Sequence, residues 1–196
     1  MFPFPILGLT NKNGQPMIIG FAGKATSGKD TAGKYFIDNY QFLHYYFAKP
    51  LKEGAKIMFG LTDEQLLNKE KVIEPWGKSP RQIYQLLGTE VGRSIDTNVW
   101  VKNAQMFIDN SCGRSVVITD VRFSNEALWI REQGGVVVYI ERNQPTIEQF
   151  GHSSENGLVD DDIDVYIDND GTIEDLHNTL GDLLNSNHTY FAKEKG

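Results

Sequence analysis

Nine consecutive residues, from Gly23 to Thr31, have the types and spacing needed to bind phosphate. Two glycines five positions apart, followed directly by a lysine, allow backbone N–H groups to converge on a phosphate with no Cβ in the way. The lysine supplies a mobile cation, and the helix expected to follow adds the partial positive charge of its N-terminus. We predict that this segment binds the phosphates of a nucleotide through Gly23, Lys24, Ala25, Thr26, Ser27, Gly28, Lys29, Asp30 and Thr31.

A magnesium ion is expected beside this phosphate loop. The pattern normally has Ser or Thr directly after the lysine to hold the ion, but here Asp30 follows Lys29 and Thr31 comes next, so either side chain could reach the metal. Asp120 ends an apolar run, Val116–Thr119, and could be a second acidic residue facing the ion, or simply a turn former. We predict metal ligands among Asp30, Thr31 and Asp120.

Phosphoryl transfer requires neutralisation of negative charge, so arginines are the next candidates. Arg122 follows Asp120 by two residues and is predicted to be catalytic together with Lys29 and Asp120. A monophosphate acceptor is largely dianionic at neutral pH and needs no general base, whereas a hydroxyl acceptor would need one, such as Asp30 or Asp120.

A second group of polar side chains is a candidate acceptor site. Arg81 and Arg93 flank an expected helix whose Gln85 and Thr89 could hydrogen-bond a base or a sugar. Solvated surface charge is the plain alternative for both arginines.

The elements expected to position these residues alternate between strands and helices. Apolar runs bounded by Gly and Pro predict five strands, and helical spacing of apolar residues between them implies a parallel sheet with helices on both faces. Thr62 with Gln65 and Ser79 with Gln82 fit capping boxes that begin two helices. The helix after Ser79 is expected to bury Ile83, Leu86, Leu87 and Val91. The strands are expected at 17–22, 42–48, 116–120, 136–140 and 164–168, while residues 50–110 and 143–160 look like insertions.

Composition limits the possible partners. With 196 residues and a net charge of −7, the chain lacks the basic surplus that binding of long DNA or RNA favours. One cysteine, Cys112, and four scattered histidines predict neither a disulfide nor a histidine–cysteine metal site. No segment has the length of a membrane span and the start lacks a signal peptide, so we expect a cytoplasmic enzyme without a membrane partner.

Taken together, these motifs resemble the phage-type deoxynucleoside monophosphate kinases of the P-loop nucleotide kinase superfamily, from Ile18 to about Leu184. The segments that carry the resemblance are Gly23–Thr31, Phe47–Lys52, Arg81–Thr89 with Arg93 and Trp100–Lys102, Thr119–Arg122 with Asn125 and Glu126, Gly151–Glu155, and Asp168–Gly171.

The resemblance implies an α/β, P-loop nucleotide-kinase-like fold in three layers, with a five-stranded parallel sheet, a helical insertion that binds the nucleoside monophosphate (NMP), and a lid. It implies one kinase domain with its core at 16–49 and 111–190, the NMP-binding region at about 50–110 and the lid at about 143–160. The activity implied is transfer of a phosphoryl group from ATP, with Mg²⁺, to a deoxynucleoside monophosphate, in the host cytoplasm if the protein is phage-encoded.

The resemblance also assigns individual residues. Arg142, at the entrance of the lid, would approach the transferring phosphoryl group, and Asn169, Asp170 and Gly171 would lie beside the adenine of ATP. The acceptor would contact Lys52, Arg81, Gln85, Thr89, Arg93, Trp100 and Arg122, although Trp100 also fits a core position.

Two other functions and one assembly stay open at this point. A P-loop kinase of a small-molecule hydroxyl, such as dephospho-coenzyme A, would use an aspartate as base, and a nucleotide-binding switch or ATPase would have no small acceptor. A homodimer is possible if aromatics among Tyr35, Tyr40, Tyr45 and Tyr46 are exposed.

Overall fold

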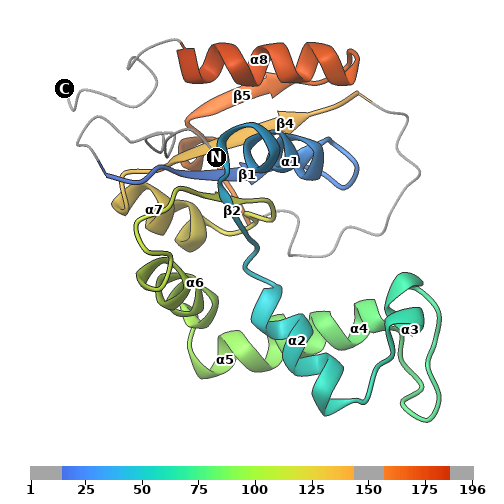
Figure 1. The fold of residues 1–196 in the computed structure, drawn as a ribbon. Coiled ribbons are helices and arrows are strands. Elements are labelled where there is room, and N and C mark those ends of the chain that lie inside the picture. The colour runs from blue at the N-terminus through green and yellow to red at the C-terminus, as the bar shows by residue number, and fades with distance from the viewer. Residues whose placement is uncertain (1–14, 144–156, 186–196) are drawn as a thin grey trace, which may run out of the picture. The chain divides into compact units, whose positions relative to one another are not determined.

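The computed structural model describes residues 15–143 and 157–185 (Figure 1). The chain divides into two compact units, and each is described here by itself. The core unit contains the described residues of Met1–Tyr46 and Phe107–Gly196, and the helical unit is Phe47–Met106. The helical unit overlaps the region predicted to bind the monophosphate, and that role stays a prediction.

The core unit contains the predicted five-stranded parallel sheet. Its strands lie in the order β2-β3-β1-β4-β5, so β1, which leads into the phosphate loop, is central. β1, β3 and β4 are rich in β-branched residues and almost wholly buried, as expected of parallel strands covered on both faces. The bounds are β1 Ile18–Ala22, β2 Leu43–Tyr45, β3 Val116–Ile118, β4 Val136–Glu141 and β5 Val165–Asp168.

Helices cover both faces of this sheet, which confirms the three-layer prediction. α1 (Lys29–Tyr40) and α8 (Ile173–Asn185) pack against each other, and Phe36 and Leu180 from these helices are fully buried in the core with Phe21 and Ile140 of the sheet. α7 (Ser124–Glu132) packs on β1, where a Cβ at Gly20 would lie 2.5 Å from Cδ1 of Ile130. A short 3₁₀ helix, Asp160–Asp162, precedes β5.

The second predicted strand is shorter than expected. We predicted residues 42–48, but β2 ends at Tyr45 and α2 (Lys49–Met58) begins soon afterwards. Pro50 lies in the first turn of α2, where its missing N–H has no helical partner to lose. Pro50 therefore lies in the first turn of a helix, whereas the apolar run at 42–48 was expected to end at this proline.

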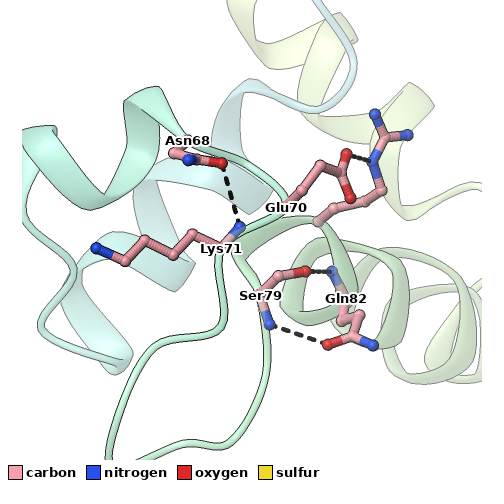
Figure 2. Close-up of polar contacts among 6 residues, drawn as sticks. Asn68, Glu70, Lys71, Ser79 and Gln82 are labelled. Carbon is pink, nitrogen blue, oxygen red and sulfur yellow. Dashed lines mark hydrogen bonds and ion pairs between the residues drawn. The ribbon is translucent and has the colours of Figure 1, made fainter.

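The helical unit begins its helices where the capping residues predict. Thr62 and Gln65 exchange side-chain and backbone hydrogen bonds at the start of α3 (Asp63–Leu67). Ser79 and Gln82 do the same before α4 (Pro80–Gln85), as Figure 2 shows. α5 (Arg93–Ile95) and α6 (Val99–Asp109) follow, and α6 continues past the end of this unit at Met106.

Between α4 and α5 the chain forms a π-helical segment, Leu86–Gly92, which corrects one prediction. We expected the helix after Ser79 to bury Ile83, Leu86, Leu87 and Val91 at α-helical spacing. Ile83 is buried and Leu87 is half-buried against the same cluster, but Leu86 and Val91 are 42% and 47% exposed, and the fully buried positions of the segment are Gly88 and Gly92. A π turn contains more residues than an α turn, so the buried face moves from position 87 to 88.

The structure also bears on the expected exposure of the tyrosines and on membrane-spanning helices. Tyr45 is buried, and Tyr35 and Tyr40 are half-buried beside Phe36, so these aromatics give no support for a dimer. Within residues 15–143 and 157–185, no helix has both the length and the apolar character needed to cross a membrane.

Candidate functional site

The phosphate loop connects the central strand β1 to α1, as predicted. Gly23 has φ 137°, and a Cβ there would lie 2.2 Å from the carbonyl oxygen of Ile140 in β4. Gly28 has φ 111° and caps α1. Both positions need glycine because the backbone is left-handed and the neighbouring chain leaves no room for a side chain.

The lysine of the loop is folded back onto the loop. Nζ of Lys29 donates to the carbonyl oxygens of Gly23 and Lys24 at 2.7 and 2.5 Å. Lys24, Ala25 and Thr26 form an exposed rim, whereas Ser27 is buried, and its hydroxyl has no hydrogen-bond partner among the described protein atoms. The loop thus keeps its cation next to the backbone that would surround a phosphate.

The predicted metal ligands lie in the first turn of α1 and just after β3. Asp30 is exposed and Thr31 half-buried in the first turn of α1, while Asp120 is half-buried just after β3. The end of β3 is tied to β1 by the bond from the Val121 N–H to the Phe21 carbonyl, at 3.1 Å. These are oxygen donors of the kind that Mg²⁺ prefers.

No protein cage for a metal is present in the described parts of the chain. Among residues 15–143 and 157–185, no three His, Cys, Asp or Glu side chains are grouped to hold an ion. Mg²⁺ commonly takes only one or two carboxylates and completes its shell with water and substrate phosphate. The donor set of Asp30, Thr31 and Asp120 therefore fits an ion that binds together with a nucleotide.

Glu126, for which the sequence predicted no role, supports the turn that carries Arg122. Arg122 itself is exposed. Its backbone N–H, and that of Phe123, donate to Oε2 of Glu126 at 2.9 and 3.2 Å. Glu126 is 2% exposed, and a buried carboxylate is costly unless it is hydrogen-bonded in this way. The signal in the sequence was an acidic residue in the first turn of a helix directly after a strand end.

Arg142 directly follows β4, and its neighbour is held by the loop after β5. The backbone N–H and the side-chain amide of Asn143 donate to the two carboxylate oxygens of Asp170 at 2.6 and 2.8 Å. These bonds lower the pKa of Asp170, the side-chain bond most, and the nearby charge of Arg142 adds to the effect. Asp170, predicted to lie beside adenine, thus binds the segment at Arg142 in this structure.

Asn169 lies between the phosphate loop and the sheet. It is 5% exposed, and its side-chain amide donates to the Ser27 carbonyl at 2.8 Å. Gly171 is exposed. Asn169, Asp170 and Gly171 follow β5, and the contacts described for Asn169 and Asp170 are with protein groups, so their place beside adenine stays a prediction.

Two of the predicted acceptor residues in the helical unit, Arg81 and Arg93, contact other protein groups in this structure. Arg81 forms an ion pair with Glu70, and Nη1 of Arg93 donates to the Thr97 carbonyl at 3.1 Å. Lys52, Gln85 and Thr89 are half-buried. The unit thus contains six of the seven predicted acceptor residues, and Arg122 belongs to the core unit.

Trp100 packs against the π-helical segment. Its indole N–H donates to the Gly88 carbonyl at 3.0 Å, and a Cβ at Gly92 would lie 2.7 Å from Cζ2 of its ring. Trp100 is half-buried. These contacts match the core position that was the alternative for this residue.

An apolar groove of the helical unit contains none of the predicted acceptor residues. It is lined by Phe59, Trp76, Lys78, Ile83, Leu86 and Leu87. The rings of Phe59 and Trp76 pack edge to face. The Trp76 indole N–H also donates to the Phe59 carbonyl at 3.0 Å.

The core unit brings four predicted groups to the carboxyl edge of one sheet. The phosphate loop follows β1, Asp120 and Arg122 follow β3, Arg142 follows β4, and Asn169–Gly171 follow β5. Ligands of open parallel sheets bind at this edge. The predicted lid, 143–160, falls largely on residues 144–156, which lie outside the described residues.

Comparison with known proteins gives a consistent result. The family model "Deoxynucleotide monophosphate kinase" matches residues 61–180. A "Putative deoxynucleotide monophosphate kinase" of Acanthamoeba polyphaga mimivirus is 34% identical over 185 residues, covering 84% of this chain and 94% of that protein. The "Deoxynucleoside-5'-monophosphate kinase" of Escherichia phage T5 is 26% identical over 212 residues, covering 72% and 85%.

Solved structures show the same fold at low sequence identity. Shikimate kinase from Aquifex aeolicus aligns with a TM-score of 0.51 at 13% identity, covering 87% of this chain and 98% of that one. The fold and the family agree with the phosphate loop found at the central strand. The chain therefore belongs to the deoxynucleotide monophosphate kinase family, whose enzymes transfer a phosphoryl group from ATP to a deoxynucleoside monophosphate.

Proposed function

We propose that the core unit binds ATP at the carboxyl edge of its sheet and that Lys29 is the main cation on the transferring phosphoryl group. The backbone of Gly23–Thr31 surrounds the outer phosphates, with the N-terminus of α1 directed at them. Lys29 leaves the carbonyls of Gly23 and Lys24 to bind phosphate oxygens. Arg122 and Arg142 add positive charge as the negative charge spreads in the transition state.

The same proposal assigns Mg²⁺ to the oxygen donors of Asp120 and of the first turn of α1, Asp30 or Thr31. When bound, the ion would supply positive charge that neutralises the phosphates of the nucleotide. Asp120 lies after β3, which pairs with β1 on the side opposite to β4. Asp120 therefore follows one neighbour of β1 and Arg142 follows the other. This arrangement suits a metal ion near Asp120 and a transferred phosphoryl group near Arg142.

For the acceptor, we propose the helical unit. Arg81 and Arg93 bind its phosphate, and Gln85 and Thr89 bind its base or sugar, with Lys52 adding charge. In this structure Arg81 is paired with Glu70, so binding requires that it exchange or share that partner. Trp100 acts on this site through the π-helical segment, because its indole N–H is directed at Gly88.

One observation supports the ATP half most strongly, namely the phosphate loop at the central strand with an acidic residue and an arginine following the two flanking strands. A monophosphate acceptor fits this arrangement because it is already largely dianionic at neutral pH and needs no general base. Family membership disfavours the two alternatives from the sequence, a hydroxyl kinase and a nucleotide-binding switch.

The test is a coupled assay of ADP release with ATP and Mg²⁺ against each deoxy- and ribonucleoside monophosphate, with identification of the diphosphate product. We expect strong stimulation by deoxynucleotides. Lys29→Ala should abolish turnover with every acceptor, since the transition state loses its cation. The matched control is Lys34→Ala, on the same helix, whose side chain is exposed and pairs only with Asp38 in the described contacts.

The acceptor half is tested by Arg93→Ala. We expect KM for the monophosphate to rise about 10-fold or more, since a charged hydrogen bond to phosphate is lost, while KM for ATP stays the same. If KM for the monophosphate matched wild type, the acceptor site would lie elsewhere.

A further inference from the structure

Asn169 makes a contact that the predicted adenine role does not explain. Its side-chain amide lies 2.8 Å from the Ser27 carbonyl, a bond between residues 142 positions apart, and both residues are buried. Gly28 makes room for this contact, since a Cβ there would lie 2.4 Å from Nδ2 of Asn169. The amide is therefore packed directly against the last turn of the phosphate loop before Lys29.

Asn169 is itself held in place by the sheet. Its backbone N–H donates to the Glu141 carbonyl at 2.8 Å, extending the ladder of β4 and β5 by one residue. The side chain thus projects from a rigid strand end and not from a free loop. A hydrogen-bond donor held by a rigid strand end can fix the position of a backbone carbonyl in the phosphate loop.

Other bonds hold the first part of the phosphate loop. Ser27 donates its backbone N–H to the Lys24 carbonyl at 3.3 Å, and Nζ of Lys29 donates to the carbonyls of Gly23 and Lys24, while the buried Ser27 hydroxyl has no hydrogen-bond partner among the described protein atoms. Because Gly28 is conformationally permissive, a bond from outside the loop to the Ser27 carbonyl can determine how the peptide between Ser27 and Gly28 is oriented. The direction of the peptide between Ser27 and Gly28 determines where the Gly28 N–H points, and this N–H belongs to the phosphate-binding set.

From these contacts we propose that Asn169 is a positioning residue, which holds the Ser27–Gly28 peptide of the phosphate loop in its phosphate-binding orientation. The inference rests on the proposed role of Gly23–Thr31 in binding ATP. It differs from the sequence expectation, in which Asn169 would contact adenine. The two roles predict different effects on the choice of nucleotide base.

The experiment compares Asn169→Ala with wild type in full-length enzyme, using ATP and GTP as alternative donors. A positioning residue acts on the phosphates common to both donors. We therefore expect kcat/KM to fall by about the same factor, roughly 10-fold, for each donor, with KM for ATP raised and KM for the monophosphate unchanged. A residue that contacts adenine would instead change the ratio of ATP to GTP activity.

Thr172→Ala is the matched control. Thr172 lies three residues away and caps α8 by exchanging hydrogen bonds with Asp175. Its loss should lower the thermal midpoint without raising KM for ATP. This separates positioning from general loss of stability, which reduces the active fraction and hence kcat.

Three results would overturn the inference: an ATP-to-GTP ratio that changes in Asn169→Ala, an unchanged KM for ATP, or an equal rise of KM in Thr172→Ala. Failure of the proposed ATP site would be visible separately, as an active Lys29→Ala enzyme.

Discussion

Replacing Glu126 by Gln tests whether a buried carboxylate stabilises the turn that carries Arg122. In the native protein the carboxylate accepts two backbone N–H bonds, at 2.9 and 3.2 Å, and is 2% exposed. Hydrogen bonds to a charged acceptor contribute about 1.5–3 kcal/mol each, and neutral ones about 0.5–1.5 kcal/mol. Glutamine keeps an acceptor oxygen but not the charge, so the expected loss over two bonds is about 2 kcal/mol.

For a chain of this size, such a loss lowers the midpoint of thermal unfolding by about 4–8 °C. Calorimetry measures the midpoint of thermal unfolding. Initial rates of ADP release measure kcat, which reports whether Arg122 is still correctly placed. We expect kcat to fall roughly 10-fold or more, because small displacements of a catalytic group have large effects on rate. Glu132→Gln is the control, since Glu132 lies on the same helix and is exposed.

The control variant should shift the midpoint by no more than about 2 °C, as is usual for surface substitutions. If Glu126→Gln and Glu132→Gln had equal midpoints and equal kcat, the carboxylate would not be supporting the turn.

Two further predictions concern other parts of the molecule. Hydrogen bonds from Asn143 lower the pKa of Asp170. The contact between these residues should therefore be complete above the ordinary pKa of 3.8 and be lost as the pH falls through the lowered value. NMR titration of the Asn143 side-chain amide should give a midpoint below 3.8. Gly92→Ala places a Cβ 2.7 Å from the Trp100 ring and should destabilise the protein by about 1–3 kcal/mol. Gly54→Ala, which meets no atom within 4 Å in α2, should instead be neutral or stabilising, and equal midpoints for these two variants would contradict the packing argument.

Much of the core unit could be predicted because its signals are local. The apolar runs at 17–22, 116–120 and 136–140 each became a strand, since short β-branched segments between turn residues have few other ways to be buried. The phosphate loop was predictable for a similar reason, because the glycines at 23 and 28 are required by the backbone itself. The capping boxes at Thr62 and Ser79 also depend only on residues three positions apart.

The features that sequence reasoning missed depend on residues far apart in the chain. Nothing near Asn169 indicates that its amide reaches Ser27, and nothing near Asp170 indicates a bond to Asn143. The π-helical segment was missed because its sequence suits an α-helix, and the departure is associated with tertiary contacts such as that of Trp100 with Gly88.

The π-helical segment also affects how this chain should be aligned with its relatives. A π turn holds one residue more than the α turn it replaces, so it can accommodate a single-residue insertion without reversing the faces of the helix. Here the buried positions run Ile83, Gly88 and Gly92, with a first interval of five and a second of four. A homologous helix one residue shorter would bury the same surface with two intervals of four. A one-residue gap between Gln85 and Gly88 in an alignment would therefore mark a change of helix type, with the residues from Gly88 onward still structurally equivalent.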